Sequence, residues 1–144
     1  MKSRARNVWQ GDLFNGSGET TLESGAVTSF PVSWASRTEV ANGKTSPEEL
    51  IAAAHASCFN MAFSNILAGD GNTPTTLETT AVATFEKVEA GFRLTTMALS
   101  VTGNVPGISA EEFADAAVKA KEGCPVSNAL KGNVEISVEA SLAA

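Results

Sequence analysis

The sequence contains few cysteines and few basic residues. Its only two cysteines, Cys58 and Cys124, lie 124 − 58 = 66 residues apart, and there is no CxxC pair and no cluster of cysteine with histidine. This spacing gives no support to a zinc site or a thioredoxin-type motif. Ten Lys and Arg residues against 16 Asp and Glu residues give a formal charge of −6, which argues against a nucleic-acid surface. We therefore expect neither a metal nor a nucleic acid as a partner.

Long apolar runs are also missing. The basic N-terminal residues include no apolar stretch of the length that a signal peptide needs. The longest apolar-rich segment, residues 50–63, is shorter than a bilayer span and contains His55 and Asn60. We expect a cytoplasmic protein without a membrane partner. Two cysteines in a reducing cytoplasm favour catalytic or sensing thiols over a structural disulfide, although inert buried cysteines are the simpler alternative.

The composition and the residue patterns predict one domain that contains both helices and strands. A chain of 144 residues, 43% of them hydrophobic, can bury one core, so we expect a single domain over residues 1–144. Alternating polar and apolar residues predict the strands, and the polar segment 33–44 is expected to be a loop. The expected strands cover residues 5–12, 19–24, 27–32, 76–88, 92–103 and 134–142. The pair 76–88 and 92–103 should be antiparallel because only a short turn joins them.

The segment TSPEEL predicts the start of the first helix. Ser46 is the expected N-cap, Pro47 occupies the first helical position, and Glu49 completes a capping box. The helix should run to about Leu67. Apolar and small residues recur along it at helical spacing, which predicts a central, buried helix. These residues are Leu50, Ala54, Cys58 and Met61.

A second helix is expected from Ser109, its N-cap, to about Gly123, followed by a short helical turn at Cys124 and Pro125. Helices that are separate from mostly antiparallel strands indicate an α+β fold.

Reactive chemistry at Cys58 would need a nearby cation. A thiol reacts as its thiolate, and a cysteine with the ordinary pKa of about 8.5 is mostly protonated at neutral pH. Cys58 lies too far along its helix to use the helix N-terminus, which leaves Arg37 and His55 as candidate cations. Arg37 is the better candidate because its charge is permanent, and Glu48 can orient its guanidinium.

The distance from Glu48 to Cys58 limits this arrangement. Ten residues of continuous helix span roughly 15 Å. Three solutions are open: the helix is broken, Arg37 bridges much of the distance, or Glu48 serves the cysteine of a second chain. We favour the third.

Each candidate also has a simpler interpretation. Cys58 is equally well an inert core residue, and His55 is more readily a core or interface histidine than a base. Glu48 can complement the helix dipole, and Arg37 taken alone is an ordinary loop arginine. Cys124 is more suggestive, since a cysteine at the start of a helical turn can have a stabilised thiolate.

The run TSPEELIAAAHASCF, followed much later by AKEGCPVS, resembles the OsmC/Ohr family of thiol peroxidases, and the OsmC branch in particular. The similarity extends to WQGD, TLESG, KVEAGF and VPGIS, and so to nearly the whole chain. The resemblance implies an OsmC-like fold that forms an intertwined homodimer, with the two long helices central and the sheets outside them.

The same resemblance implies the roles of four residues. Cys58 would be the peroxidatic cysteine, Cys124 the resolving cysteine, and Arg37 and Glu48 the activating pair. The implied reaction is reduction of organic hydroperoxides and hydrogen peroxide without a cofactor, through a Cys58 sulfenic acid that Cys124 converts to a disulfide. An external dithiol would reset the enzyme. The alternatives are an Ohr-like preference for bulky hydroperoxides, and a non-catalytic dimeric stress or redox-sensing protein with core cysteines.

Overall fold

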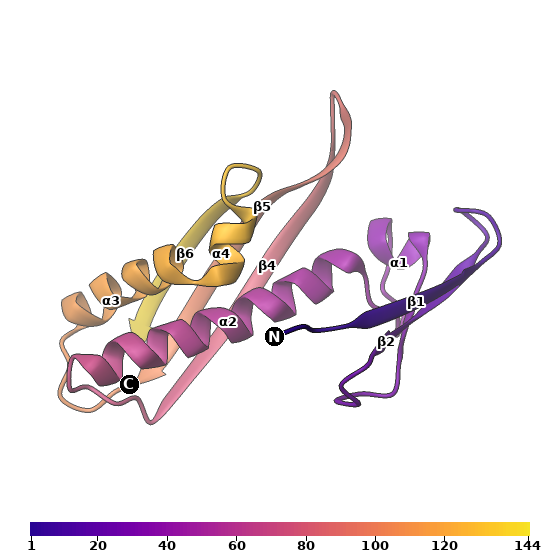
Figure 1. Ribbon diagram of the computed structural model, residues 1–144. Coiled ribbons are helices and arrows are strands. Elements are labelled where there is room, and N and C mark those ends of the chain that lie inside the picture. The colour runs from indigo at the N-terminus through magenta and orange to yellow at the C-terminus, as the bar shows by residue number, and fades with distance from the viewer. The chain divides into compact units, whose positions relative to one another are not determined.

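The computed structural model describes residues 1–144 and divides them into two compact units, residues 1–50 and residues 51–144. The element order is three short strands, two helices, a long strand pair, two further helices and a last strand (Figure 1). The α+β class expected from the sequence is confirmed. The number of domains in the intact protein stays a prediction, and each unit is described by itself.

The first unit contains a small antiparallel sheet and a short helix. Its strands are β1 (Ala5–Gln10), β2 (Ser17–Leu22) and β3 (Phe30–Val32), paired in the order β1-β2-β3. The predicted third strand is therefore shorter than expected. The prediction of a loop over residues 33–44 is wrong in part, because α1 (Trp34–Thr38) lies inside it. The capping box of Ser33 and Ser36 starts this helix.

The helix α2 (Pro47–Gly69) is continuous over its whole length. Ser46 caps it as predicted, since its Oγ accepts a hydrogen bond of 3.1 Å from the Glu49 backbone N–H. The other half of the expected capping box does not form. The Glu49 carboxylate instead accepts a hydrogen bond of 2.6 Å from Thr45 Oγ1.

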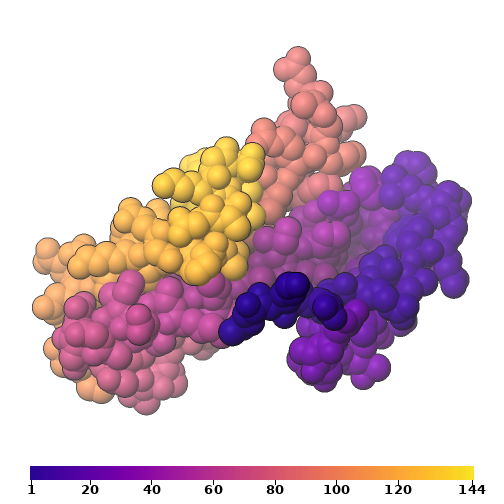
Figure 2. Space-filling view, in the orientation of Figure 1, coloured from indigo at the N-terminus to yellow at the C-terminus, as the bar shows by residue number.

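The second unit is built on a three-stranded sheet in the order β4-β5-β6. β4 (Thr76–Val88) and β5 (Gly91–Asn104) are antiparallel as predicted, whereas β6 (Glu135–Leu142) joins β5 in parallel. Because β6 pairs only with Thr96–Gly103 of β5, the turn end of the β4–β5 pair extends past it. Figure 2 shows this end as a narrow projection.

The core of the second unit forms between the sheet and the helices α2 and α3 (Ala110–Gly123). Phe59, Phe63 and Leu67 of α2 are fully buried there, and the ring of Phe113 in α3 packs 4.9 Å from that of Phe63. Burial of each such side chain contributes about 1.5 to 3 kcal/mol. Gly103 of β5 lies so close to the Phe113 ring that a Cβ there would collide with it.

The buried face of α2 differs from the one predicted. Within the second unit, the buried α2 residues are Ala52, His55, Phe59, Phe63 and Leu67. On the face that we expected to be buried, Ala54 is exposed, Cys58 is half-buried and Met61 is 71% exposed. The Ala-rich sequence makes both faces apolar, so periodicity alone could not choose between them.

By length and composition, α2 is also the one helix that could cross a membrane. A single helix of this kind is weak evidence for a membrane, because the core helix of a soluble protein passes the same test. Phe59, Phe63 and Leu67 are fully buried, as in a core helix.

Candidate active site

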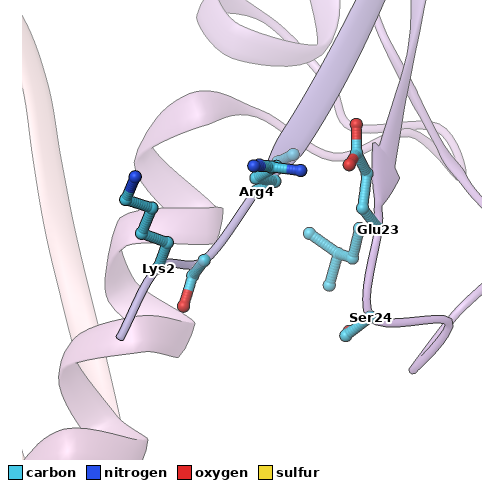
Figure 3. Close-up of a pocket in the computed structure, with 7 residues that line it drawn as sticks. Lys2, Arg4, Glu23 and Ser24 are labelled. Atoms are coloured by element: carbon cyan, nitrogen blue, oxygen red, sulfur yellow. The ribbon is translucent and has the colours of Figure 1, made fainter.

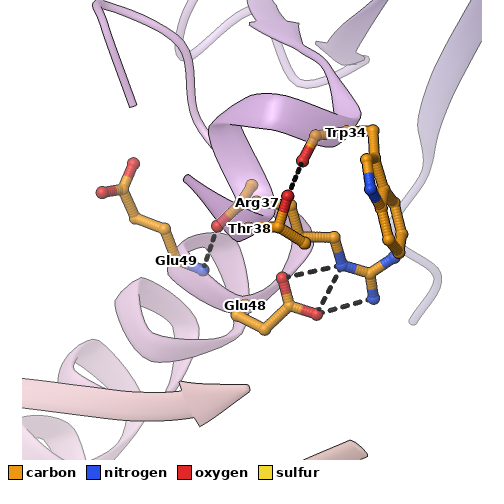
Figure 4. Close-up of polar contacts among 6 residues, drawn as sticks. Trp34, Arg37, Thr38, Glu48 and Glu49 are labelled. Carbon is orange, nitrogen blue, oxygen red and sulfur yellow. Dashed lines mark hydrogen bonds and ion pairs between the residues drawn. The ribbon is translucent and has the colours of Figure 1, made fainter. Parts of the chain in front are cut away.

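Arg37 and Glu48 form an ion pair within the first unit, as the sequence predicts. Arg37 lies in α1 and Glu48 in the first turn of α2, and Figure 4 shows the guanidinium facing the carboxylate. Arg37 Nη2 lies 2.7 Å from Glu48 Oε1, and Arg37 Nε lies 3.0 and 3.1 Å from the two carboxylate oxygens. Glu48 is buried whereas the Arg37 side chain is 30% exposed. The carboxylate thus fixes an arginine that solvent can reach.

Trp34 forms a second contact with Arg37. The Arg37 Cζ atom lies 5.7 Å from the Trp34 ring centre, and Thr38 Oγ1 donates a hydrogen bond of 3.0 Å to the Trp34 carbonyl. An arginine over an aromatic face is attracted by the negative potential of the ring. The guanidinium is therefore oriented from two directions. Trp34 is a site residue that the sequence did not reveal, because the helix that brings it one turn before Arg37 was not predicted.

Cys58 and Cys124 form the other pair, within the second unit. Cys58 lies in α2, and Cys124 lies at the junction between α3 and α4 (Pro125–Leu130), where it ends one helix and starts the next. Both thiols are free, Cys58 is half-buried and Cys124 is fully buried. The two thiols are close enough to affect each other, since Cys124 raises the pKa of Cys58. Folding has thus brought together two cysteines that the sequence separates by 66 residues.

The surroundings of Cys58 in its own unit do not favour a thiolate. Burial raises the pKa of the Cys58 thiol, and the interaction with Cys124 raises it further. The backbone of Val126 lowers the pKa of Cys58, but its effect is smaller than that of burial. Activation of this thiol therefore requires a cation from outside this immediate environment.

His55 is not that cation. It is fully buried, its Nε2 lies 2.7 Å from Ser127 Oγ in α4, and its Nδ1 has no hydrogen-bond partner. Burial lowers the pKa of His55 below its ordinary value of 6.5, so the ring is neutral at physiological pH. The interpretation of His55 as a core histidine is thus the correct one. Ser127 was not singled out from the sequence, although its place in the tract GCPVS was a visible signal.

Burial of His55 should make the protein less stable in mild acid. Because the folded state resists protonation of His55, the unfolded state binds more protons below pH 6.5, and the free energy of unfolding falls as pH drops below that value. Above pH 6.5 this contribution is constant. Urea unfolding at about pH 7, 6 and 5 should show a slope of up to about 1.4 kcal/mol per pH unit.

The variant His55→Gln is the control. Because it lacks the imidazole, its free energy of unfolding should depend less on pH than that of the wild type. The shifted carboxyl groups of Asp12 and Glu112 do not interfere, because their pKa values lie below 3.8 and 4.5 and they titrate at lower pH. Equal slopes for the wild type and His55→Gln would contradict the prediction.

The two pairs belong to different compact units. Arg37 and Glu48 lie within residues 1–50, and Cys58 and Cys124 lie within residues 51–144. Because α2 is unbroken from Pro47 to Gly69, the broken-helix solution to the distance between Glu48 and Cys58 is wrong. A cysteine pair and an arginine–carboxylate pair are therefore both present, and their combination in one site is a proposal.

Two cavities lie in the first unit. The larger, of about 650 Å³, lies between the N-terminal residues and the end of β2 and contains no nucleophile. Figure 3 shows its polar lining from Lys2, Arg4, Glu23 and Ser24. The second, of about 350 Å³, has an apolar wall beside the guanidinium. Its lining includes Trp9, Leu13, Val32, Trp34, Arg37 and Leu50.

Comparisons with known proteins agree on one family. The family model described as OsmC-like protein matches residues 40–139. The chain is 45% identical over 131 residues to Peroxiredoxin OsmC of Escherichia coli strain K12, a match that covers 91% of each protein. It is 36% identical over 97 residues to the organic hydroperoxide resistance protein OhrA of Bacillus subtilis strain 168, with 66% of each covered.

A solved structure extends the likeness to the fold. The organic hydroperoxide resistance protein OsmC of Legionella pneumophila matches with a TM-score of 0.76 and 28% identity, over 100% of this chain and 98% of that one. Fold and cysteine pair together define an α+β protein with a paired dithiol. The chain belongs to the OsmC family.

Proposed function

We propose that this protein is a thiol-dependent peroxidase that reduces organic hydroperoxides to alcohols and hydrogen peroxide to water. The contact between Cys58 and Cys124 carries the proposal, because it places a second thiol where a peroxide-oxidised cysteine can be resolved. The names of the relatives in the OsmC family support the same activity. No cofactor is needed for this chemistry.

The reaction has three steps. The Cys58 thiolate attacks the outer oxygen of the hydroperoxide, the O–O bond breaks, and the departing alkoxide takes a proton to become the alcohol. Cys58 is then a sulfenic acid. The Cys124 sulfur attacks the Cys58 sulfur, water leaves, and a Cys58–Cys124 disulfide forms. An external dithiol reduces this disulfide by exchange and is itself oxidised to a disulfide.

Activation of Cys58 is assigned to Arg37, held by Glu48. A cation beside Cys58 would oppose the rise in its pKa, and the guanidinium can also stabilise the negative charge on the leaving oxygen. The Arg37 side chain is partly exposed while its Glu48 partner is buried, as this role requires.

The partner in this activation is proposed to be a second copy of the chain. An intertwined homodimer would cover the apolar face of α2, on which Ala54 is exposed and Met61 is 71% exposed. Cys58 lies on the same face. In such a dimer, Arg37 and Glu48 of one chain would serve Cys58 of the other.

The apolar cavity beside Arg37 supports organic hydroperoxides as substrates. A cavity of about 350 Å³ with two tryptophans in its wall can hold an alkyl or aryl group, whose burial contributes to binding. The peroxide oxygens would then face the guanidinium. We place the protein in the cytoplasm, without a nucleic-acid or membrane partner, where a dithiol reductant is available.

Peroxide turnover tests the function directly. With excess dithiothreitol, the protein should consume cumene hydroperoxide and hydrogen peroxide over many turnovers. A single equivalent of peroxide without reductant should give one intramolecular disulfide, found by peptide mapping between the Cys58 and Cys124 peptides. One turnover followed by a stable disulfide in the presence of the dithiol would indicate a redox sensor, and no oxidation at all would indicate inert core cysteines.

A further inference from the structure

Next to the cysteine pair, His55 and Ser127 form a second contact between α2 and α4. His55 lies three residues before Cys58, and Ser127 lies three residues after Cys124. Residues three apart in a helix face the same side, and Ser127 lies in the first turn of the helix that Cys124 caps. The helix α2 therefore contacts α4 and its N-cap at two neighbouring points. One is the pair of thiols, and the other is the hydrogen bond of 2.7 Å between His55 Nε2 and Ser127 Oγ.

Both partners of this hydrogen bond are buried. His55 is fully buried and Ser127 is 5% exposed. The other ring nitrogen, Nδ1, is buried without a partner, so Ser127 supplies the only polar contact of the imidazole. A buried N–H without an acceptor is costlier than an acceptor without a donor, which favours the form in which Nε2 carries the proton and donates to Ser127 Oγ. Loss of the hydroxyl would leave both ring nitrogens unsatisfied.

The position of Cys124 depends on such contacts. Cys124 is the N-cap residue of α4, which has only six helical residues, and its side chain makes no capping hydrogen bond there. An isolated helix needs about 12 to 15 residues to be even marginally stable in water. The segment that carries the second thiol is therefore held in place by packing and by its bonds to neighbouring elements.

We propose that the hydrogen bond between His55 and Ser127 positions Cys124 for its attack on oxidised Cys58. The proposal rests on the proposed function, since it concerns the step in which the sulfenic acid and the Cys124 thiol give a disulfide and water. Because His55 and Ser127 are both buried, we assign them positioning roles and no contact with the peroxide. By holding α4 on α2, they raise the effective concentration of one thiol at the other.

The experiment compares Ser127→Ala with Ser137→Ala, which removes an exposed hydroxyl from β6 of the same unit. Rapid mixing with cumene hydroperoxide, followed by an acid quench and mass spectrometry, gives the rates of sulfenic acid and disulfide formation separately. Titration with glutathione and its disulfide gives the stability of the Cys58–Cys124 disulfide without any peroxide. Conversion of Cys58 to sulfinic acid at high peroxide reports how long the sulfenic acid survives.

For Ser127→Ala we expect disulfide formation to slow about tenfold, while sulfenic acid formation is unchanged. The disulfide equilibrium should shift about tenfold toward the dithiol, equivalent to about 30 mV. Sulfinic acid should accumulate at lower peroxide than in the wild type. Ser127→Thr, which keeps the hydroxyl, and His55→Gln, whose new amide can still form a hydrogen bond with Ser127, should both form the disulfide faster than Ser127→Ala, and Ser137→Ala should match the wild type.

The double variant His55→Leu with Ser127→Ala guards against a folding defect, because it replaces the whole polar pair by apolar groups. Its disulfide formation should remain slow even if its stability recovers, whereas a merely structural role predicts that rate and stability recover together. Equal disulfide rates and equal glutathione equilibria for Ser127→Ala and Ser137→Ala would overturn the proposal. If the wild type does not react with peroxide but Ser127→Ala still shifts the glutathione equilibrium, the positioning role is supported and the peroxidase function is rejected.

Discussion

Cys58→Ser should lower the consumption of cumene hydroperoxide by about a thousandfold or more, to the level of buffer with dithiothreitol. The reason is that Cys58 is the half-buried member of the cysteine pair, and Cys124 is fully buried. Peroxide can therefore reach Cys58, and serine at that position is far too weak a nucleophile to break the O–O bond. The measurement is the steady-state loss of peroxide with excess dithiol.

Cys124→Ser is the matched control, since it makes the same chemical change at the other thiol. It should retain the first oxidation of Cys58, which an electrophile that traps sulfenic acid will detect, but form no intramolecular disulfide. Its steady-state cycle should be slowed or altered, because the external thiol must then attack the sulfenic acid itself. Unchanged peroxide consumption by Cys58→Ser would favour the interpretation of the cysteines as inert core residues.

Local signals in the sequence were sufficient for most elements of the fold. Ser46 and Ser109 cap their helices where predicted, and Glu112 completes the capping box of α3. These predictions succeed because a cap depends on residues within one turn of each other. The helix α1 was not predicted because it lacks a comparable local signal. It is five residues long and has no buried residue, so it leaves no apolar periodicity in the sequence.

The sequence predicted part of the candidate site. Contacts between residues close together in the chain were easier to predict than contacts between distant residues. The pairing of Arg37 with Glu48 followed from charge complementarity across 48 − 37 = 11 residues. The contact between His55 and Ser127 spans 127 − 55 = 72 residues and depends on how α4 lies on α2. No pattern within either segment specifies it. Within the second unit of one chain, the buried face of α2 is not the predicted one, because small apolar residues occur all around this helix.

Glu48→Ala should reduce peroxidase activity about a hundredfold, and mixing it with Cys58→Ser should restore part of it. Without the carboxylate, Arg37 loses the three hydrogen bonds that hold its guanidinium and no longer stabilises the thiolate or the leaving oxygen. If Arg37 and Glu48 serve the partner chain, a mixed dimer contains one complete site. That site combines Cys58 of the Glu48→Ala chain with Glu48 of the Cys58→Ser chain. Random exchange of subunits should then give about a quarter of wild-type activity.

The matched control is a mixture of Glu48→Ala with the double variant Glu48→Ala and Cys58→Ser, in which no complete site can form in either arrangement. It should stay as inactive as Glu48→Ala alone. If the pair served Cys58 of its own chain, no mixed dimer would regain activity, because each chain would lack one member of its site. Subunits should be exchanged through mild denaturation and the mixed dimer isolated by a tag on one chain, so that a failure to exchange is not mistaken for a failure to complement. An isolated mixed dimer without activity would show that Glu48 does not act across the interface, and would leave a bridging Arg37 within one chain as the remaining solution to the roughly 15 Å between Glu48 and Cys58.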